Sequence, residues 1–266
     1  GFSHVYLEKP GAPTVAELES MAAYAKAKGV PVYMGFNRNF SKYVRSAQEF
    51  MANAPALATA TFTLGRKDMF DTLESLDECF ERNPDGMLKN MMIHEVVVMI
   101  SCFGLKGSAI EEIVPDREYT RIETRNGLTD LSRMACAIIT TSGQEFKLWG
   151  DRSNGEYAEV VVQVDGKEAF KAVRPDAEIS NNAKALETAD PGCMSYFYFQ
   201  DGEYLALKGQ VVEHIASGRP GAPEGVANME TAIEGLRVCD RITEALGCQG
   251  GSPGTPHEAQ EGREGQ

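Results

Sequence analysis

The first forty residues alternate between short apolar runs and one polar segment with helix signals. The run His4-Val5-Tyr6-Leu7 predicts a strand, and Val30–Phe36 predicts a second one. Between them, Thr14 and Glu17 form a capping box that opens a helix reaching Lys28. A strand, helix and strand of this length make a βαβ unit. Residues 1–40 therefore predict two parallel strands with a ligand crevice at their carboxyl ends.

The next segment mixes helices with one strand. Residues 41–53 predict a helix, and Ala56–Leu64 predicts a strand. Lys67–Asp85 is polar but has apolar residues at helical spacing, which predicts a short helix over a cleft. Met87–Phe103 is apolar almost all round, so we expect a helix that is buried on most sides.

The pattern then changes to strands in succession. Asp165-Gly166 and Ser142-Gly143 are hairpin turns, so neighbouring runs should pair antiparallel. The predicted strands are Ile110–Glu118, Leu131–Thr141, Glu145–Gly150, Tyr157–Val164 and Ala169–Val173. Two helices follow, roughly Tyr196–Ser217 and Val226–Leu246. Residues 249–266 are rich in Gly, Pro, Glu and Gln, and we expect them to be disordered.

Composition narrows the functional classes. The 266 residues have a formal net charge of −13 and no Lys/Arg-rich stripe, which argues against nucleic-acid binding and against anionic membrane surfaces. No apolar stretch is long enough to span a membrane, and no signal peptide is visible. Six scattered cysteines without a C-x-x-C pair favour reduced thiols and no metal site. A cytoplasmic location follows, although a lost targeting signal would change it.

A few residues have positions suited to chemistry. Lys9 ends the first strand of the βαβ unit, where an ammonium can hydrogen-bond a substrate hydroxyl; otherwise it is a solvated surface lysine. Arg38 ends the second strand, so two cations should flank one crevice, unless Arg38 simply pairs with an acid. His94 lies within the apolar helix, with Asn90 four residues earlier on the same face. This pair is either hydrogen-bonded core or a general base with its orienting partner, and Glu95 is a weaker candidate for the partner.

Taken in order, these residues resemble the Gfo/Idh/MocA oxidoreductases. The hallmark Glu-Lys-Pro of that family matches Glu8, Lys9 and Pro10, and its Gly-x-x-Arg pattern matches Gly35–Arg38. The family also has a glycine turn into a helix with Asp-x-x-x-His and a closing glycine. The matching residues here are Gly86, Asn90, His94 and Gly104.

The resemblance covers roughly residues 4–246 and implies a two-part fold. Residues 1–54 would be the remnant of an NAD(P)-binding Rossmann domain, an α/β piece with parallel strands. Residues 55–248 would be an α+β domain, an open antiparallel sheet with helices on one face, for substrate binding and for homo-oligomer formation through the sheet. Residues 249–266 would be a disordered tail.

The resemblance also implies the chemistry. Family members use NAD or NADP to oxidise or reduce a carbon of a sugar, polyol or diol. Lys9 would be the catalytic lysine and His94 the acid/base, with Asn90 beside it. Glu8, Lys9, Pro10 and Arg38 would contact the cofactor.

Two departures from the family pattern leave alternatives open. Asn90 stands where the family has an aspartate; it cannot titrate but can still orient an imidazole. No G-x-G-x-x-G occurs, and the chain starts almost inside a strand, as if the front of the Rossmann domain had been cut away. The alternatives are a non-catalytic paralogue that acts as a dimerisation or binding module, and an NAD-dependent glycoside hydrolase of the same family.

Overall fold

The computed structural model describes residues 2–54, 60–70 and 72–248, and it begins with the expected βαβ unit. Strand β1 (Val5–Glu8) pairs in parallel with β2 (Val32–Gly35), with Val5 opposite Val32 and Glu8 opposite Gly35. Helix α1 (Val15–Lys28) connects them; Thr14 and Glu17 form its capping box, and it ends at Gly29 with a φ of 64°. The predicted parallel arrangement is confirmed.

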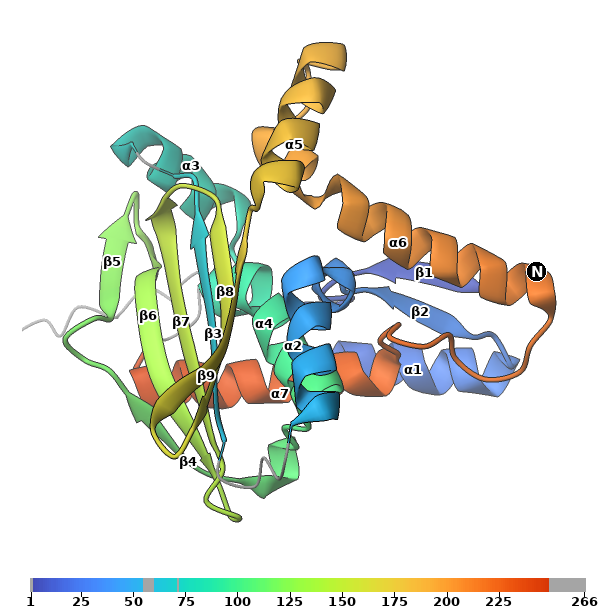
Figure 1. Ribbon diagram of the computed structural model, residues 1–266, viewed down its shortest axis with the longest axis horizontal. Helices are drawn as coiled ribbons and strands as arrows, with labels where there is room; N and C mark the ends of the chain where they lie inside the picture. Colours follow the sequence, from blue (N-terminus) through green and yellow to red (C-terminus); the bar gives the residue numbers. More distant parts are fainter. Residues whose placement is uncertain (1, 55–59, 71, 249–266) are drawn as a thin grey trace, which may run out of the picture.

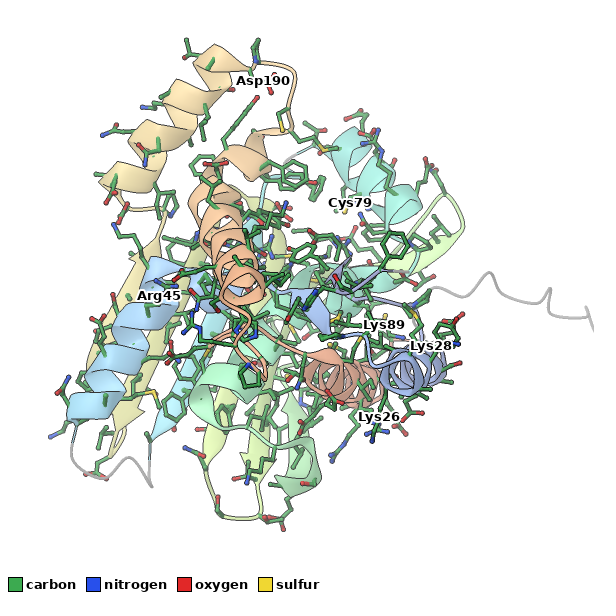
Figure 2. All side chains as sticks on the ribbon, turned by 90° about the vertical axis from the view of Figure 1, so that its right-hand side faces the viewer. Lys26, Lys28, Arg45, Cys79, Lys89 and Asp190 are labelled. Atoms are coloured by element: carbon green, nitrogen blue, oxygen red, sulfur yellow. The ribbon has the colours of Figure 1, made fainter. Side chains whose placement is uncertain are left out.

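This small sheet lies between helices on both sides, two of which come from the C-terminal part of the chain. Helix α6 (Ser195–Ser217) runs across one side, and α1 lies beside α7 (Met229–Leu246) on the other (Figures 1 and 2). Tyr33 of β2 packs with Leu207 and Val211 of α6 in one apolar cluster. The carboxyl end of β2 continues into the 3₁₀ turn η1 (Asn37–Phe40) and helix α2 (Lys42–Asn53).

The second sheet is larger and mixed. Its strand order is β4-β6-β7-β3-β8-β9, with β5 also paired to β6. The strands are β3 (Thr61–Asp68), β4 (Ile110–Pro115), β5 (Arg121–Arg125), β6 (Leu128–Thr140), β7 (Glu145–Asn154), β8 (Tyr157–Val164) and β9 (Lys167–Arg174). The sheet is antiparallel as expected except for one pair, because β3 is inserted between β7 and β8 and runs parallel to β7. The β6–β7 and β8–β9 hairpins at the two predicted turns are confirmed.

Two elements were absent from the prediction and one strand was shifted. Strand β5 and helix α5 (Ala177–Ala189) were both missed; α5 packs on α6 and projects from the body of the molecule (Figure 1). The strand predicted at Ala56–Leu64 is β3, which starts at Thr61, and residues 55–59 lie outside the described residues. The expected disorder of 249–266 concerns residues that are likewise outside the description.

The predicted helix Met87–Phe103 is two structures in succession. It begins with the π-helical segment η2 (Leu88–Met92) and continues as α4 (Ile93–Phe103), after the short helix α3 (Leu73–Arg82). Helix α4 is buried on nearly all sides, as its composition indicated. Helices α2, α4 and α7 pack against strands of the large sheet, so α4 lies between that sheet and the small one. Among the described residues, no helix is long and apolar enough to cross a bilayer.

Candidate functional site

A pocket of about 190 Å³ lies where the small sheet, the large sheet and α6 meet. This volume is below the range of about 300–1,000 Å³ that suits drug-sized ligands, so the pocket fits a small molecule or part of one. Both Lys9 and His94 line it, although 85 positions separate them in the sequence. The other lining residues are Arg66, Asp68, Phe70, Asn83, Asn90, Met91, Tyr196, Phe197, Gln200 and Tyr204.

Lys9 reaches this pocket from the carboxyl end of β1. Its ammonium donates a hydrogen bond to the backbone carbonyl of Asn90. Burial and, after it, the nearby Arg66 guanidinium lower the pKa of Lys9 to about 8, against the opposing effect of Glu95. The ammonium is therefore a proton donor that becomes neutral just above physiological pH.

The π-helical segment explains how hydrogen-bond donors from distant parts of the chain gather around this helix. A π turn closes i→i+5 hydrogen bonds and leaves carbonyls free for other donors. Here Asn90 O accepts from Lys9, Met91 O accepts from Arg66 Nη1 at 3.4 Å, and Leu88 O accepts from the Cys239 thiol at 3.6 Å. Helical distortions of this kind are frequent at functional sites, and this one lies against the pocket.

His94 is 4% exposed and lies edge-on to Phe36, with ring centroids 6.0 Å apart. Burial lowers the pKa of His94 well below its ordinary value, and the cations of Lys9, Arg66 and Arg38 lower it further. The imidazole is therefore neutral at physiological pH. Its buried Nδ1 has no hydrogen-bond partner among the residues that the structure describes.

The expected hydrogen bond between Asn90 and His94 is absent from the described structure. Both residues line the pocket, but Asn90 lies in the π segment, where the wider turn rotates it relative to a residue four positions later. The sequence prediction assumed the spacing of a regular α-helix and therefore placed the Asn90 side chain wrongly relative to His94. Asn90 contributes to the site in a second way, because its backbone carbonyl accepts a hydrogen bond from Lys9.

Glu95 lies behind the pocket among the same cations. It is 1% exposed, and within the described part of the chain neither carboxylate oxygen has a hydrogen-bond partner. Burial raises the pKa of Glu95, while Arg66 and Arg38 oppose that rise. Arg66 is only loosely engaged, since its distance to the Asp68 carboxylate is 3.9 Å.

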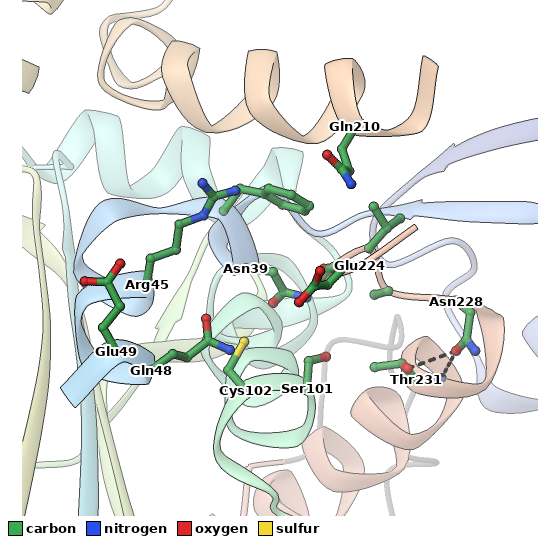
Figure 3. Close-up of a pocket in the computed structure, with 14 residues that line it drawn as sticks. Asn39, Arg45, Gln48, Glu49, Ser101, Cys102, Gln210, Glu224, Asn228 and Thr231 are labelled. Atoms are coloured by element: carbon green, nitrogen blue, oxygen red, sulfur yellow. Dashed lines mark hydrogen bonds between the residues drawn. The ribbon is translucent and has the colours of Figure 1, made fainter. Parts of the chain in front are cut away.

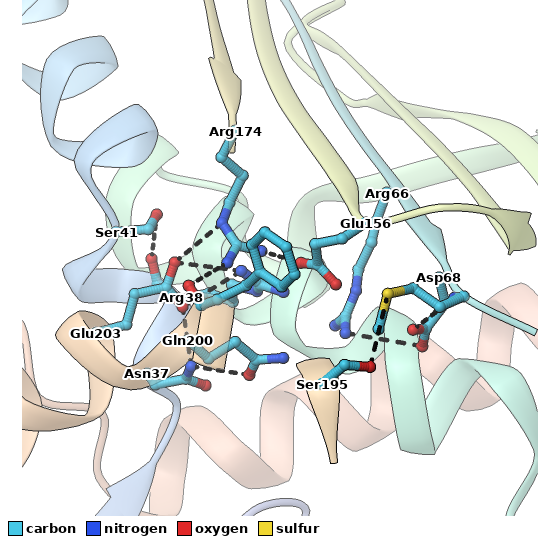
Figure 4. A network of polar contacts seen from close by, with 12 residues as sticks. Asn37, Arg38, Ser41, Arg66, Asp68, Glu156, Arg174, Ser195, Gln200 and Glu203 are labelled. Atoms are coloured by element: carbon cyan, nitrogen blue, oxygen red, sulfur yellow. Dashed lines mark hydrogen bonds and ion pairs between the residues drawn. The ribbon is translucent and has the colours of Figure 1, made fainter. Parts of the chain in front are cut away.

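Arg38 does not line the pocket, contrary to the expectation that it flanks a common crevice with Lys9. It is fully buried in a polar network, where it contacts Glu203 at 3.2 Å and Glu156 at 3.5 Å (Figure 4). Arg174 joins the same two acids. The alternative considered for Arg38, pairing with an acid, is the arrangement observed, because two carboxylates balance the two buried guanidinium groups.

Among the four residues expected to contact a cofactor, only Lys9 has its side chain in the pocket lining. Glu8 is exposed and Pro10 is partly buried next to it. The sequence prediction also missed residues of the pocket. Arg66 and Asp68 end an apolar strand, which is the same signal that identified Lys9. Tyr196 and Phe197 belong to a run of four aromatic residues, a pattern that by itself is more typical of a core or an interface than of a polar pocket.

A larger cavity of about 690 Å³ lies elsewhere, between α2, α4, α6 and the start of α7 (Figure 3). Arg45 and Gln210 point toward it from α2 and α6. The thiol of Cys102 in its lining is unreactive, because burial raises its pKa to about 12. We assign the chemistry to the smaller pocket, since a buried imidazole and a lysine of lowered pKa meet there.

No metal centre is evident in the described part of the chain, where no three His, Cys, Asp or Glu side chains are grouped as ligands. The pocket lining offers a neutral imidazole, an ammonium, a guanidinium, a carboxylate and several amides, together with four aromatic rings. Such a set can bind hydroxyl groups and move a proton at one of them.

Comparison with solved structures identifies the fold. The scyllo-inositol dehydrogenase of Lactobacillus casei, solved with NAD(H) and scyllo-inositol, superimposes with a TM-score of 0.68 at 16% identity, over 92% of this chain and 71% of that one. GenD2 from gentamicin A biosynthesis, solved with NAD, gives 0.67 at 17% identity, over 92% and 69%. The myo-inositol 2-dehydrogenase of Lactobacillus plantarum gives 0.66 at 14% identity, over 92% and 71%.

No protein-family model matches the chain, and no curated protein matches its sequence. The structural matches therefore concern the fold. They confirm the fold that the Gfo/Idh/MocA resemblance implied, with a parallel Rossmann-like piece followed by a sheet domain.

Proposed function

We propose that this chain is a Gfo/Idh/MocA oxidoreductase that transfers a hydride between NAD or NADP and a carbon of a sugar, polyol or diol. One observation supports this most strongly: Lys9 and His94 line one pocket in a chain with the fold of NAD-binding inositol dehydrogenases. Loss of a hydride and of a hydroxyl proton occur at one carbon–oxygen unit, so the groups that assist both must converge.

In this proposal His94 accepts the proton of the substrate hydroxyl. A neutral imidazole is required for that step, and the lowered pKa of His94 keeps it neutral. Lys9 donates a hydrogen bond to the same oxygen and stabilises the negative charge that develops there. When bound, the oxidised nicotinamide supplies the hydride acceptor.

The residues present fit the nicotinamide end of such a cofactor. Lys9 lies at the carboxyl end of a parallel strand, where open α/β sheets bind their ligands. The sequence has no glycine-rich turn for a pyrophosphate. We therefore assign the cofactor's reactive end to the Lys9 side of the pocket and assign no residue to its phosphates; Glu8 and Pro10 would contact the adjoining ribose through their backbone.

The substrate class follows from the pocket's mixture of groups. Lys9 and Arg66 donate hydrogen bonds, Asp68 accepts them, and Asn83 can do both. Tyr196 and Phe197 offer ring faces beside these polar groups, with centroids 4.3 Å apart. A polyhydroxylated ring or chain matches both features, whereas a purely apolar ligand would leave the charges unpaired.

The non-catalytic alternative has one specific observation in its favour. Lys9 is bound to the carbonyl of Asn90, and Asn90 itself cannot take up a proton. A glycoside hydrolase with transient hydride transfer remains the third candidate, because it would use the same two groups. The large sheet is the surface we assign to homo-oligomer formation, and the acidic composition disfavours a nucleic-acid partner.

The test is hydride transfer with NAD and NADP against myo-inositol, scyllo-inositol, glucose and sorbitol, followed by the absorbance of reduced nicotinamide. The proposal expects turnover that His94→Ala and Lys9→Ala nearly abolish, while Lys184→Ala on exposed α5 leaves it unchanged. Turnover that survives His94→Ala would reject the mechanism. Binding of a polyol without any turnover would favour the non-catalytic alternative, and release of a glycoside's leaving group would favour the hydrolase.

A further inference from the structure

Gln200 belongs both to the pocket and to the buried polar network beside it. It lies on α6, lines the same pocket as Lys9 and His94, and is 4% exposed. Its Oε1 accepts a hydrogen bond from Asn37 Nδ2 at 3.2 Å. Figure 4 shows its amide nitrogen turned away from Asn37, toward the side where Arg66 and Ser195 lie.

The network fixes which amide atom faces the pocket. Asn37 Nδ2 also donates to Glu203 Oε2 at 2.9 Å, and Glu203 is held by the guanidinium groups of Arg38 and Arg174. A carboxylate in such an ion pair only accepts hydrogen bonds, so the Asn37 atom that faces it must be the nitrogen. The second hydrogen of that nitrogen then requires an oxygen, and this atom is Oε1 of Gln200.

The amide nitrogen of Gln200 is left with two unused hydrogens. Among the described residues it has no hydrogen-bond partner, and it is not one of the side-chain atoms that are both unpartnered and fully shielded from solvent. A reversed Gln200 amide would place its own NH₂ group against the NH₂ group of Asn37, so that two donors would face each other without an acceptor. The pocket therefore has one donor of fixed direction in addition to its charged groups.

We infer that Gln200 is a specificity-determining residue, whose Nε2 donates a hydrogen bond to one acceptor oxygen of the substrate other than the reacting one. Asn37 and Glu203 are positioning residues that hold the amide in this orientation. The inference rests on the proposed function, because it names a substrate contact of that site. A ligand that lacks an acceptor at this place leaves the amide of a residue that is only 4% exposed without a partner, and is bound less tightly.

The experiment compares one polyol with its monodeoxy analogues by ligand-observed NMR titration of the full 266-residue chain, which needs no turnover. The probe is myo-inositol or D-glucose, whichever binds more tightly. Gln200→Leu should weaken binding of the parent compound about threefold to tenfold. For one monodeoxy analogue, the affinity for the unaltered protein should equal the affinity of the parent compound for Gln200→Leu. The affinity of that analogue should be the same for Gln200→Leu as for the unaltered protein.

Two further variants keep the result interpretable. Gln200→Glu retains an oxygen for Asn37 but replaces the donor with a second, negatively charged oxygen, so it should also weaken binding of the parent compound. Gln210→Leu changes the same residue type on the same helix at the other cavity and should leave binding unchanged. Equal affinity of Gln200→Leu and the unaltered protein, an equal loss for every analogue, or no binding of either probe would overturn the inference. Gln200-dependent binding without hydride transfer would support it and reject the proposed dehydrogenase activity.

Discussion

The Lys9 ammonium is buried beside the Arg66 guanidinium, and the resulting low pKa of Lys9 should be visible in the pH dependence of activity. The pKa of Lys9 is lowered to about 8, so the ammonium loses its proton as the pH rises through that value. If the charged form stabilises the developing alkoxide, kcat/KM should fall above pH of about 8. Lys9→Arg should remove this alkaline limb, because a guanidinium stays charged, although at a lower rate. If the alkaline fall of kcat/KM persists in Lys9→Arg, another titrating group causes it.

Asn90 offers a test of the electrostatics around His94. Asn90→Asp places a carboxylate in the same pocket, and a nearby negative charge raises the pKa of an imidazole. We expect the acidic limb of the rate profile, which lies below the ordinary histidine range in the unaltered protein, to move to higher pH. NMR titration of the His94 ring measures the same shift directly.

The matched control for this substitution is Asn181→Asp on the exposed surface of α5, which adds the same charge far from the pocket. It should leave the His94 titration in place. An unchanged His94 pKa in Asn90→Asp would mean that residue 90 does not interact with the imidazole through its side chain.

For individual residues, the sequence predicted which side chains are central to the pocket but not which contacts they make. Lys9 and His94 could be found because each follows a local signal, the end of a strand and a polar group in an apolar helix. The π segment could not be foreseen, since its wider turn depends on donors from Lys9, Arg66 and Cys239 that are distant in sequence. Arg38 was misassigned because its partners, Glu156 and Glu203, come from later elements.

Among the elements, the contact between β3 and β7 tolerates little change. A Cβ added at Gly65 would lie 1.9 Å from Trp149, whose Nε1 donates to Glu159. Gly65→Ala must therefore displace the indole ring, and we expect a loss of about 1–3 kcal/mol in the free energy of unfolding. Trp149 is the single tryptophan, so its fluorescence reports both the displacement and the urea unfolding curve.

Gly209→Ala on α6 is the appropriate comparison, since nothing lies within 4 Å of an added Cβ there. A glycine in a helix interior is less favourable than alanine by roughly 0.5–1 kcal/mol, so this variant should be slightly more stable. Equal stability of Gly65→Ala and the unaltered protein would show that the indole can move without loss.

The strands next to the two hairpin turns could be predicted because the turn residues and the apolar pattern of each strand lie within a few residues of one another. Strand β5 was missed because Arg121–Arg125 is short and mostly charged, and α5 because its apolar residues are sparse. The parallel partner of β3 has no signature within β3 itself. Pairing between distant strands is decided by which faces can be buried together, and a single segment does not contain that information.

Across the whole molecule, the buried network of Figure 4 joins three segments that are distant in sequence. Glu203 of α6 contacts Arg38 of η1 and Arg174 at the end of β9. Glu203→Ala leaves two guanidinium groups, each no more than 1% exposed, with Glu156 as their remaining acid in the network. We expect a loss of about 3–5 kcal/mol in the free energy of unfolding, measured in urea.

The control is Glu213→Ala on the same helix, where the side chain is exposed and lies 4.0 Å from Arg219. Its effect should stay within about 0.5 kcal/mol. If both variants unfold at the same urea concentration, the buried ion pairs do not stabilise the junction between the two sheets.

The insertion of β3 also dictates an order of assembly. A short turn connects β7 and β8, yet these strands do not pair with each other, because β3 lies between them and pairs with both. Its residue Thr61 lies opposite Glu145, 84 positions later in the chain. The centre of the sheet therefore closes only after a long loop has closed, and topologies with such distant contacts fold slowly. Until then β7 and β8 expose two unpaired edges to any other strand in solution, including the same strands of a second chain during synthesis.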